Sequence, residues 1–171
     1  MSKPGEGFIS GGGYLVLADS AGLYAGSVGT KSNYGFKASA TVLNNGNVQL
    51  RGRTTIIVRS ADGHKYKIKS NALLSLGVDL DPDGDGDAES EPHAVQFESK
   101  ANLTDVTDPL NPVSLGGNLL LQIRMTDNGE PGENDTISFT LWDGGSLLFS
   151  SHWDGAQSVE QSVGGGNLQV H

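Results

Sequence analysis

The sequence contains no cysteine, few aromatic residues and no long apolar run. The absence of cysteine excludes disulfides, thiolate metal ligands and cysteine nucleophiles. The longest apolar stretches, such as residues 119–121, fall far short of the ~20 residues that a membrane-spanning helix needs, so we expect no membrane insertion. Basic residues are also scarce, with 11 Lys and Arg against 20 Asp and Glu. This acidic balance argues against nucleic acid as a partner.

Glycine is abundant instead, at 25 of 171 residues, and helical periodicity is almost absent because Gly, Pro, Asn and Asp interrupt most windows. Alternation of apolar and polar residues is frequent and predicts strands. The clearest runs are 34–42, 48–59, 119–126 and 137–142. With the turn signals between them, they predict an all-β single domain over residues 1–171, an antiparallel β-sandwich or closed β-barrel of about nine or ten strands.

Two departures from this strand pattern are expected. A single helical turn is predicted around residues 70–76. Long loops are predicted at 79–92 and 105–117, where prolines, glycines and acids accumulate.

The most specific motif is an acidic segment, residues 79–91, which holds seven acids and no Lys or Arg. Its spacing, D-x-D-x-D-G-x-x-D, places carboxylates at alternate positions before a glycine turn, as calcium loops do. A calcium site would relieve the repulsion among these acids, although the segment also fits a solvated acidic loop. The predicted calcium ligands are Asp79, Asp81, Asp83, Asp85, Asp87 and Glu91.

A second segment rich in oxygen ligands joins two predicted strands. Its candidate ligands are Asp127, Asn128, Glu130 and Asp135. Asn-Gly and Pro-Gly also build hairpin loops without metal, so a plain turn remains the alternative.

The catalytic motifs that we sought do not occur. None of the four histidines has the spacing of a metalloenzyme motif, and no serine lies in a G-x-S-x-G elbow. We therefore expect a non-catalytic protein. The alternative is a polysaccharide-active enzyme that uses His152 or His93, with Asp154 as the residue that orients the His152 imidazole.

Two surfaces are candidates for binding. Trp142 and Trp153 are suited to stack on a sugar ring, with His152 beside them; a core or lid role is the alternative. Separately, residues 48–69 carry six bases and one acid. If 48–59 and 64–69 pair, these bases share one face, either as a solvated surface or as a contact for an anionic polymer or for the acidic loop of a neighbouring copy.

Four segments together resemble the bacterial post-COAP domains: Gly11-Gly12-Gly13-Tyr14, Asn33-Tyr34-Gly35-Phe36, the 127–135 turn running into Thr136-Ile137-Ser138-Phe139, and Gly165-Gly166-Asn167-Leu168-Gln169-Val170-His171. The resemblance implies a β-rich, secreted or cell-surface module with a non-catalytic accessory role, and it brings no ligand or catalytic residue with it. Residues 1–5 show no leader sequence, so we expect a mature or excised domain.

The sequence thus predicts a calcium-stabilised extracellular module for adhesion to a surface glycan or to a protein partner. The second interpretation is self-assembly into a homo-oligomer or polymer. The third is the enzyme considered above.

Overall fold

The computed structural model describes residues 7–79, 93–127 and 135–170, and within these ranges it contains strands and no helix. The described residues form ten strands: β1 (Gly7–Val16), β2 (Lys31–Val42), β3 (Val48–Arg59), β4 (Lys65–Asp79), β5 (His93–Asp105), β6 (Val113–Asp127), β7 (Thr136–Asp143), β8 (Ser146–Ser150), β9 (Gln161–Ser162) and β10 (Gly165–Val170).

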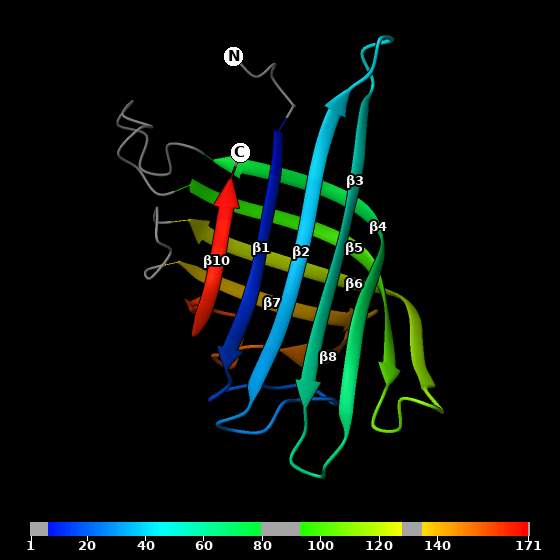
Figure 1. The fold of residues 1–171 in the computed structure, drawn as a ribbon, viewed down its shortest axis with the longest axis vertical. Helices are drawn as coiled ribbons and strands as arrows, with labels where there is room; N and C mark the ends of the chain where they lie inside the picture. The colour runs from blue at the N-terminus through cyan, green and yellow to red at the C-terminus, as the bar shows by residue number, and fades with distance from the viewer. Residues whose placement is uncertain (1–6, 80–92, 128–134, 171) are drawn as a thin grey trace.

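The strands form one antiparallel sheet that nearly closes into a barrel. The order is β10-β1-β2-β3-β4-β5-β6-β7-β8, with β9 added to β7. Figure 1 shows β10, β1, β2 and β3 as one layer and β5 to β8 crossing behind it. The predicted all-β class and the number of strands are confirmed.

The alternation in the sequence sets which side chains face the interior. On β2, Tyr34, Phe36 and Ala38 are buried while Lys37 between them is exposed. The predicted strand at 48–59 coincides with β3, whose Ile56 and Val58 face the core. Side chains that alternate in this way fit a sheet with one face packed and one face solvated.

The predicted helical turn at 70–76 is wrong, because β4 runs through it. Asn71 and Leu74 are extra residues opposite β5, so that the register shifts twice. Such bulges bend a strand, and β4 bends here from the front layer into the rear layer (Figure 1). Hydrogen bonding to β5 along the whole of β4 outweighs the local signal for a turn.

The predicted loop at 105–117 is shorter than expected, since β5 extends to Asp105 and β6 begins at Val113. The glycine-rich strand β1 was not predicted. Glycine weakens isolated strands, but β1 pairs with β10 on one side and with β2 on the other, and these ladders hold it extended.

Aromatic rings join the two layers in the core. The Tyr34 ring of β2 lies 5.3 Å from the Phe139 ring of β7, and Phe36 lies 5.7 Å from Phe97 of β5. The two layers therefore share one core. In the described ranges no helix has the length and apolar character needed to cross a membrane.

Candidate functional site

Most of the predicted calcium ligands lie outside the described residues: Asp81, Asp83, Asp85, Asp87, Glu91, Asn128 and Glu130. Asp79 ends β4 and Asp127 ends β6, and only their backbones are described. The metal prediction at these positions therefore stays a prediction. Within the described ranges, no three His, Asp or Glu side chains gather as a metal site would require.

The strand register nevertheless locates where both acidic segments leave the sheet. Asp79 pairs with Ala94, His93 pairs with Asp127, and Thr126 pairs with Thr136. The two segments thus leave the same end of neighbouring hairpins, with β5 between Asp79 and Asp127. At about 4.8 Å per strand spacing, the two backbones lie roughly 10 Å apart.

Asp135, a predicted ligand of the second segment, is fully buried. It lies near the Tyr34 phenol, whose pKa is raised strongly, first by burial and then by the negative charge of Asp135. A carboxylate removed from water in this way must be compensated by hydrogen bonds or by a cation.

The structure brings Trp142 and Trp153 together, as the binding hypothesis requires. Trp142 is on β7, and Trp153 is on the loop after β8. Their rings meet edge to face at 6.2 Å. The pair walls a hollow of about 110 Å³ on the outer side of β6 and β7, whose other lining residues are Gln122, Arg124, Ser138, Thr140, Ala156, Gln157 and Ser158.

Hydrogen bonds fix the walls of this hollow. Trp142 Nε1 donates to Gln122 Oε1 at 3.0 Å, and Gln122 Nε2 donates to Glu98 Oε2 at 3.0 Å. On the loop side, Thr140 Oγ1 donates to Ser158 Oγ at 2.5 Å. Trp142 and Gln122 are therefore held in place before any ligand arrives.

His152 is not part of this hollow. Its Nε2 lies 3.6 Å from Asp19 Oδ2, too far for a hydrogen bond, so the two form an ion pair only when the imidazole is protonated. The expected partner, Asp154, instead accepts hydrogen bonds from the backbone of Ala156 and Gln157. The prediction that Asp154 orients His152 is therefore wrong, because the Asp154 carboxylate is hydrogen-bonded to the backbone of its own tight turn, residues 154–157.

The basic face predicted on 48–69 is confirmed and is larger than the sequence indicated. β3 pairs with β4 so that Arg59 lies opposite Lys65, and β2 pairs with β3 so that Lys37 lies opposite Arg53. Of the 11 Lys and Arg in the chain, eight belong to this face: Lys31, Lys37, Arg51, Arg53, Arg59, Lys65, Lys67 and Lys69.

None of the outward positions in the paired segments 31–41, 49–59 and 65–69 carries an acid. The face also places like charges opposite one another, as at Lys37 and Arg53, an arrangement that destabilises a sheet. An acidic chain thus carries most of its positive charge on one exposed face.

A polar cluster that sequence reasoning missed joins β4 to the end of β5. His64 Nδ1 lies 2.7 Å from Asp105 Oδ2, and Thr107 Oγ1 donates to Asp105 Oδ1 at 2.5 Å. These hydrogen bonds, with those from Thr107 foremost, lower the pKa of Asp105. His64 and Asp105 are 41 residues apart, so no local motif announces the pair.

Replacement of Thr107 by valine is expected to weaken the acid dependence of stability. The folded pKa of Asp105 lies below its unfolded value of about 3.8. Its stabilising contribution is therefore present above that pH and is lost as the pH falls through the folded pKa. Without the Thr107 hydroxyl the folded pKa rises toward the unfolded one, and the difference in melting temperature between pH 7 and pH 3 shrinks.

Thr41→Val, at an exposed threonine of β2, is the control and should leave that difference unchanged. Thermal melts across the pH series provide the measurement. An equal acid dependence in Thr107→Val and wild type would contradict the assignment.

Comparison with known proteins adds no relative: no family model, no curated protein and no solved structure matches the chain significantly.

Proposed function

We propose that this domain is a non-catalytic attachment module that binds a glycan through the hollow between Trp142 and Trp153. One observation carries the proposal: the only two tryptophans of the chain, 11 positions apart in sequence, wall the same polar hollow. The resemblance to post-COAP domains supports a bacterial cell-surface or extracellular setting.

The chemistry of the hollow suits a sugar. Indole faces pack against the C–H faces of a sugar ring, while amide, hydroxyl and guanidinium groups bond its hydroxyls. Gln122, Gln157 and Arg124 supply such groups around the two rings. At about 110 Å³ the hollow is well below the ~300–1,000 Å³ of pockets for larger ligands, so it accepts one unit of a polymer or a chain end.

Calcium is the second part of the proposal. Strand pairing puts Asp79 and Asp127, the first residues of the two acidic segments, at one end of the sheet. A hard cation with six to eight oxygen ligands neutralises such a group of carboxylates. Calcium would then stabilise the barrel in a chain that has no disulfide.

Trp153→Ala is expected to weaken glycan binding at least tenfold, because it removes one wall of the hollow; each tenfold corresponds to about 1.4 kcal/mol. The probes are soluble oligosaccharides of glucose, N-acetylglucosamine, mannose and galacturonate. Intrinsic tryptophan fluorescence reports on this hollow alone, since both tryptophans line it, and titration calorimetry provides the affinities.

Val28→Ala removes an apolar side chain that is 76% exposed on another loop, and it should bind as wild type does. Trp153→Phe keeps an aromatic wall and should lose less affinity than Trp153→Ala. The proposal fails if none of the four oligosaccharides changes fluorescence or releases heat, or if Trp153→Ala binds them unchanged.

A further inference from the structure

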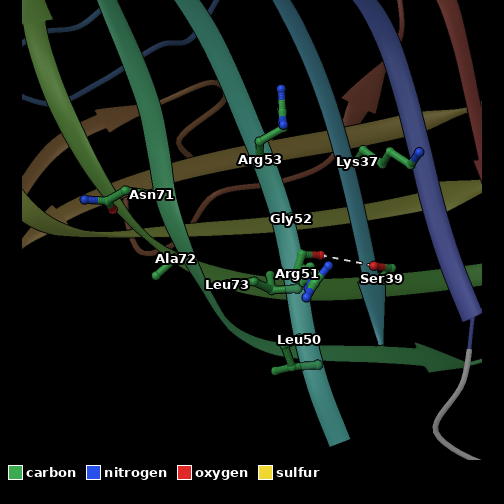
Figure 2. Close-up of a pocket in the computed structure, with 9 residues that line it drawn as sticks. All are labelled: Lys37, Ser39, Leu50, Arg51, Gly52, Arg53, Asn71, Ala72 and Leu73. Carbon is green, nitrogen blue, oxygen red and sulfur yellow. Dashed lines mark hydrogen bonds between the residues drawn. The ribbon is translucent and has the colours of Figure 1, made fainter. Parts of the chain in front are cut away.

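A notch opens on the basic face where β3 and β4 part. The two strands pair only from Thr55 opposite Lys69 to Arg59 opposite Lys65. One further hydrogen bond, from Thr54 N to Ser70 Oγ at 2.7 Å, marks the last link between them. Beyond it β4 turns into the rear layer at its bulges, and Figure 2 shows it curving behind β3.

The notch is a cavity of about 580 Å³, within the ~300–1,000 Å³ range of ligand sites. Its rim carries Lys37, Arg51 and Arg53, and its apolar lining includes Leu50 and Leu73. No acid lines it. Within the described residues, neither Arg51 nor Arg53 forms an ion pair.

One wall of the notch is an open strand edge. Among the described strands, residues 48–53 of β3 pair with β2 alone. Alternate residues of an antiparallel strand direct their peptide groups to the same side. Because the Thr54 N–H points to Ser70 of β4, the peptide groups of Gly52 and Leu50 also point into the notch.

We propose that this notch accepts an extended acidic segment of a partner protein, which adds to β3 as a strand. Open edges recruit strands through main-chain hydrogen bonds, and side-chain pockets provide specificity. Here the edge offers the peptide groups of Leu50 and Gly52. The cations on the outer side select carboxylates, and they repel basic strands.

The geometry also fixes the pattern of the partner segment. Side chains of an added strand alternate between the two faces. Those on the outer side meet Lys37, Arg51 and Arg53, and those on the inner side meet Leu50 and Leu73. The fitting sequence therefore alternates acidic and apolar residues. This inference does not depend on the glycan site, which lies on β6 and β7.

The test uses three synthetic peptides and one polymer. The first peptide is Asp-Val-Asp-Val-Asp-Val-Asp. The second contains the same residues in blocks, and the third is the alternating peptide with N-methylated valines, which lack the backbone donors. Dextran sulfate supplies negative charge without a peptide backbone. Fluorescence anisotropy of labelled peptides, and competition by dextran sulfate, measure binding to the whole chain.

The alternating peptide is expected to bind at least tenfold more tightly than the block and N-methylated peptides, and binding should weaken with salt because exposed charges are screened. The double variant Arg51→Gln and Arg53→Gln should bind the alternating peptide at least tenfold more weakly than wild type. Its matched control, Lys65→Gln and Lys67→Gln, removes two charges of the same face outside the notch and should keep wild-type affinity. Thermal melts check that both variants fold.

A second pair of variants tests the strand edge itself. Leu50→Pro removes the N–H that faces the notch and leaves the hydrogen bonds to β2, whereas Leu50→Ala keeps that N–H. Only Leu50→Pro should lose affinity for the alternating peptide because of the missing N–H. The proposal is overturned if the alternating peptide fails to bind at about 1 mM, or if the block or N-methylated peptide binds equally well. It is also overturned if dextran sulfate does not displace the peptide from the wild-type chain. A dimer in sedimentation that the double variant Arg51→Gln and Arg53→Gln does not form would overturn it too, because the notch would then be filled by a second copy.

Discussion

Addition of calcium to the chelated protein is expected to raise its melting temperature by about 5–10 °C. A ligand at a hundredfold excess over its dissociation constant stabilises the folded state by about 2.7 kcal/mol. For a chain of this size, 1 kcal/mol shifts the melting temperature by about 2–4 °C. The expected source of the shift is the acidic segment 79–91, because a bound cation would offset the mutual repulsion of its seven acids.

A charge-neutralised variant separates calcium binding from a general salt effect. Asp81→Asn, Asp83→Asn and Asp85→Asn together should abolish the calcium-dependent shift and should raise the melting temperature in chelator, since the repulsion is relieved. Asp143→Asn, at an exposed acid before the β7–β8 turn, should retain the shift. An identical transition in calcium and in chelator would remove calcium from the proposal.

Replacement of Phe139 by alanine is expected to reduce the free energy of unfolding by about 3–5 kcal/mol. Phe139 is fully buried, and its ring contacts Tyr34 of the opposite layer, so its loss leaves a cavity between the two layers. Because the two layers share this core, the variant should still unfold in a single transition, with its midpoint at a lower urea concentration. Urea titration followed by circular dichroism and by fluorescence measures the free energy of unfolding and shows the number of transitions.

Leu110→Ala is the control for the core substitution, because this leucine is 87% exposed and surface changes usually cost less than ~0.5 kcal/mol. Two separate transitions in Phe139→Ala would show that the layers unfold independently. A loss below ~1 kcal/mol would mean that the ring does not join them as the structure indicates.

Local patterns allowed several elements to be predicted closely. The alternation over 48–59 matches β3 at both ends, since side-chain direction along a strand depends only on period two. The same alternation placed Arg51, Arg53 and Arg59 on one face with Lys65, Lys67 and Lys69. It failed at residues 70–76, where pairing with β5 keeps a locally irregular segment extended.

The candidate site depended on contacts that the sequence does not encode locally. Trp142 and Trp153 were predicted as binding residues from the sequence. The partner that fixes Trp142 was not, because Gln122 lies 20 positions earlier, on the neighbouring strand. His152 was grouped with them by adjacency alone, and the structure turns it toward Asp19. Lys31 and Lys37 joined the basic face only because β2 is the neighbour of β3.

By itself the sequence determined the β class, the inward and outward residues of the strands with clear alternation, such as β2, β3 and β7, and the presence of two acidic segments with calcium-like ligands. Only the tertiary structure decided that both segments leave one end of the sheet, that two tryptophans share a hollow, and that the bend of β4 opens a basic notch. The physical reason is that alternation is a local property of the chain, whereas the choice of neighbouring strand and the bulges that bend it are set by pairing between distant residues.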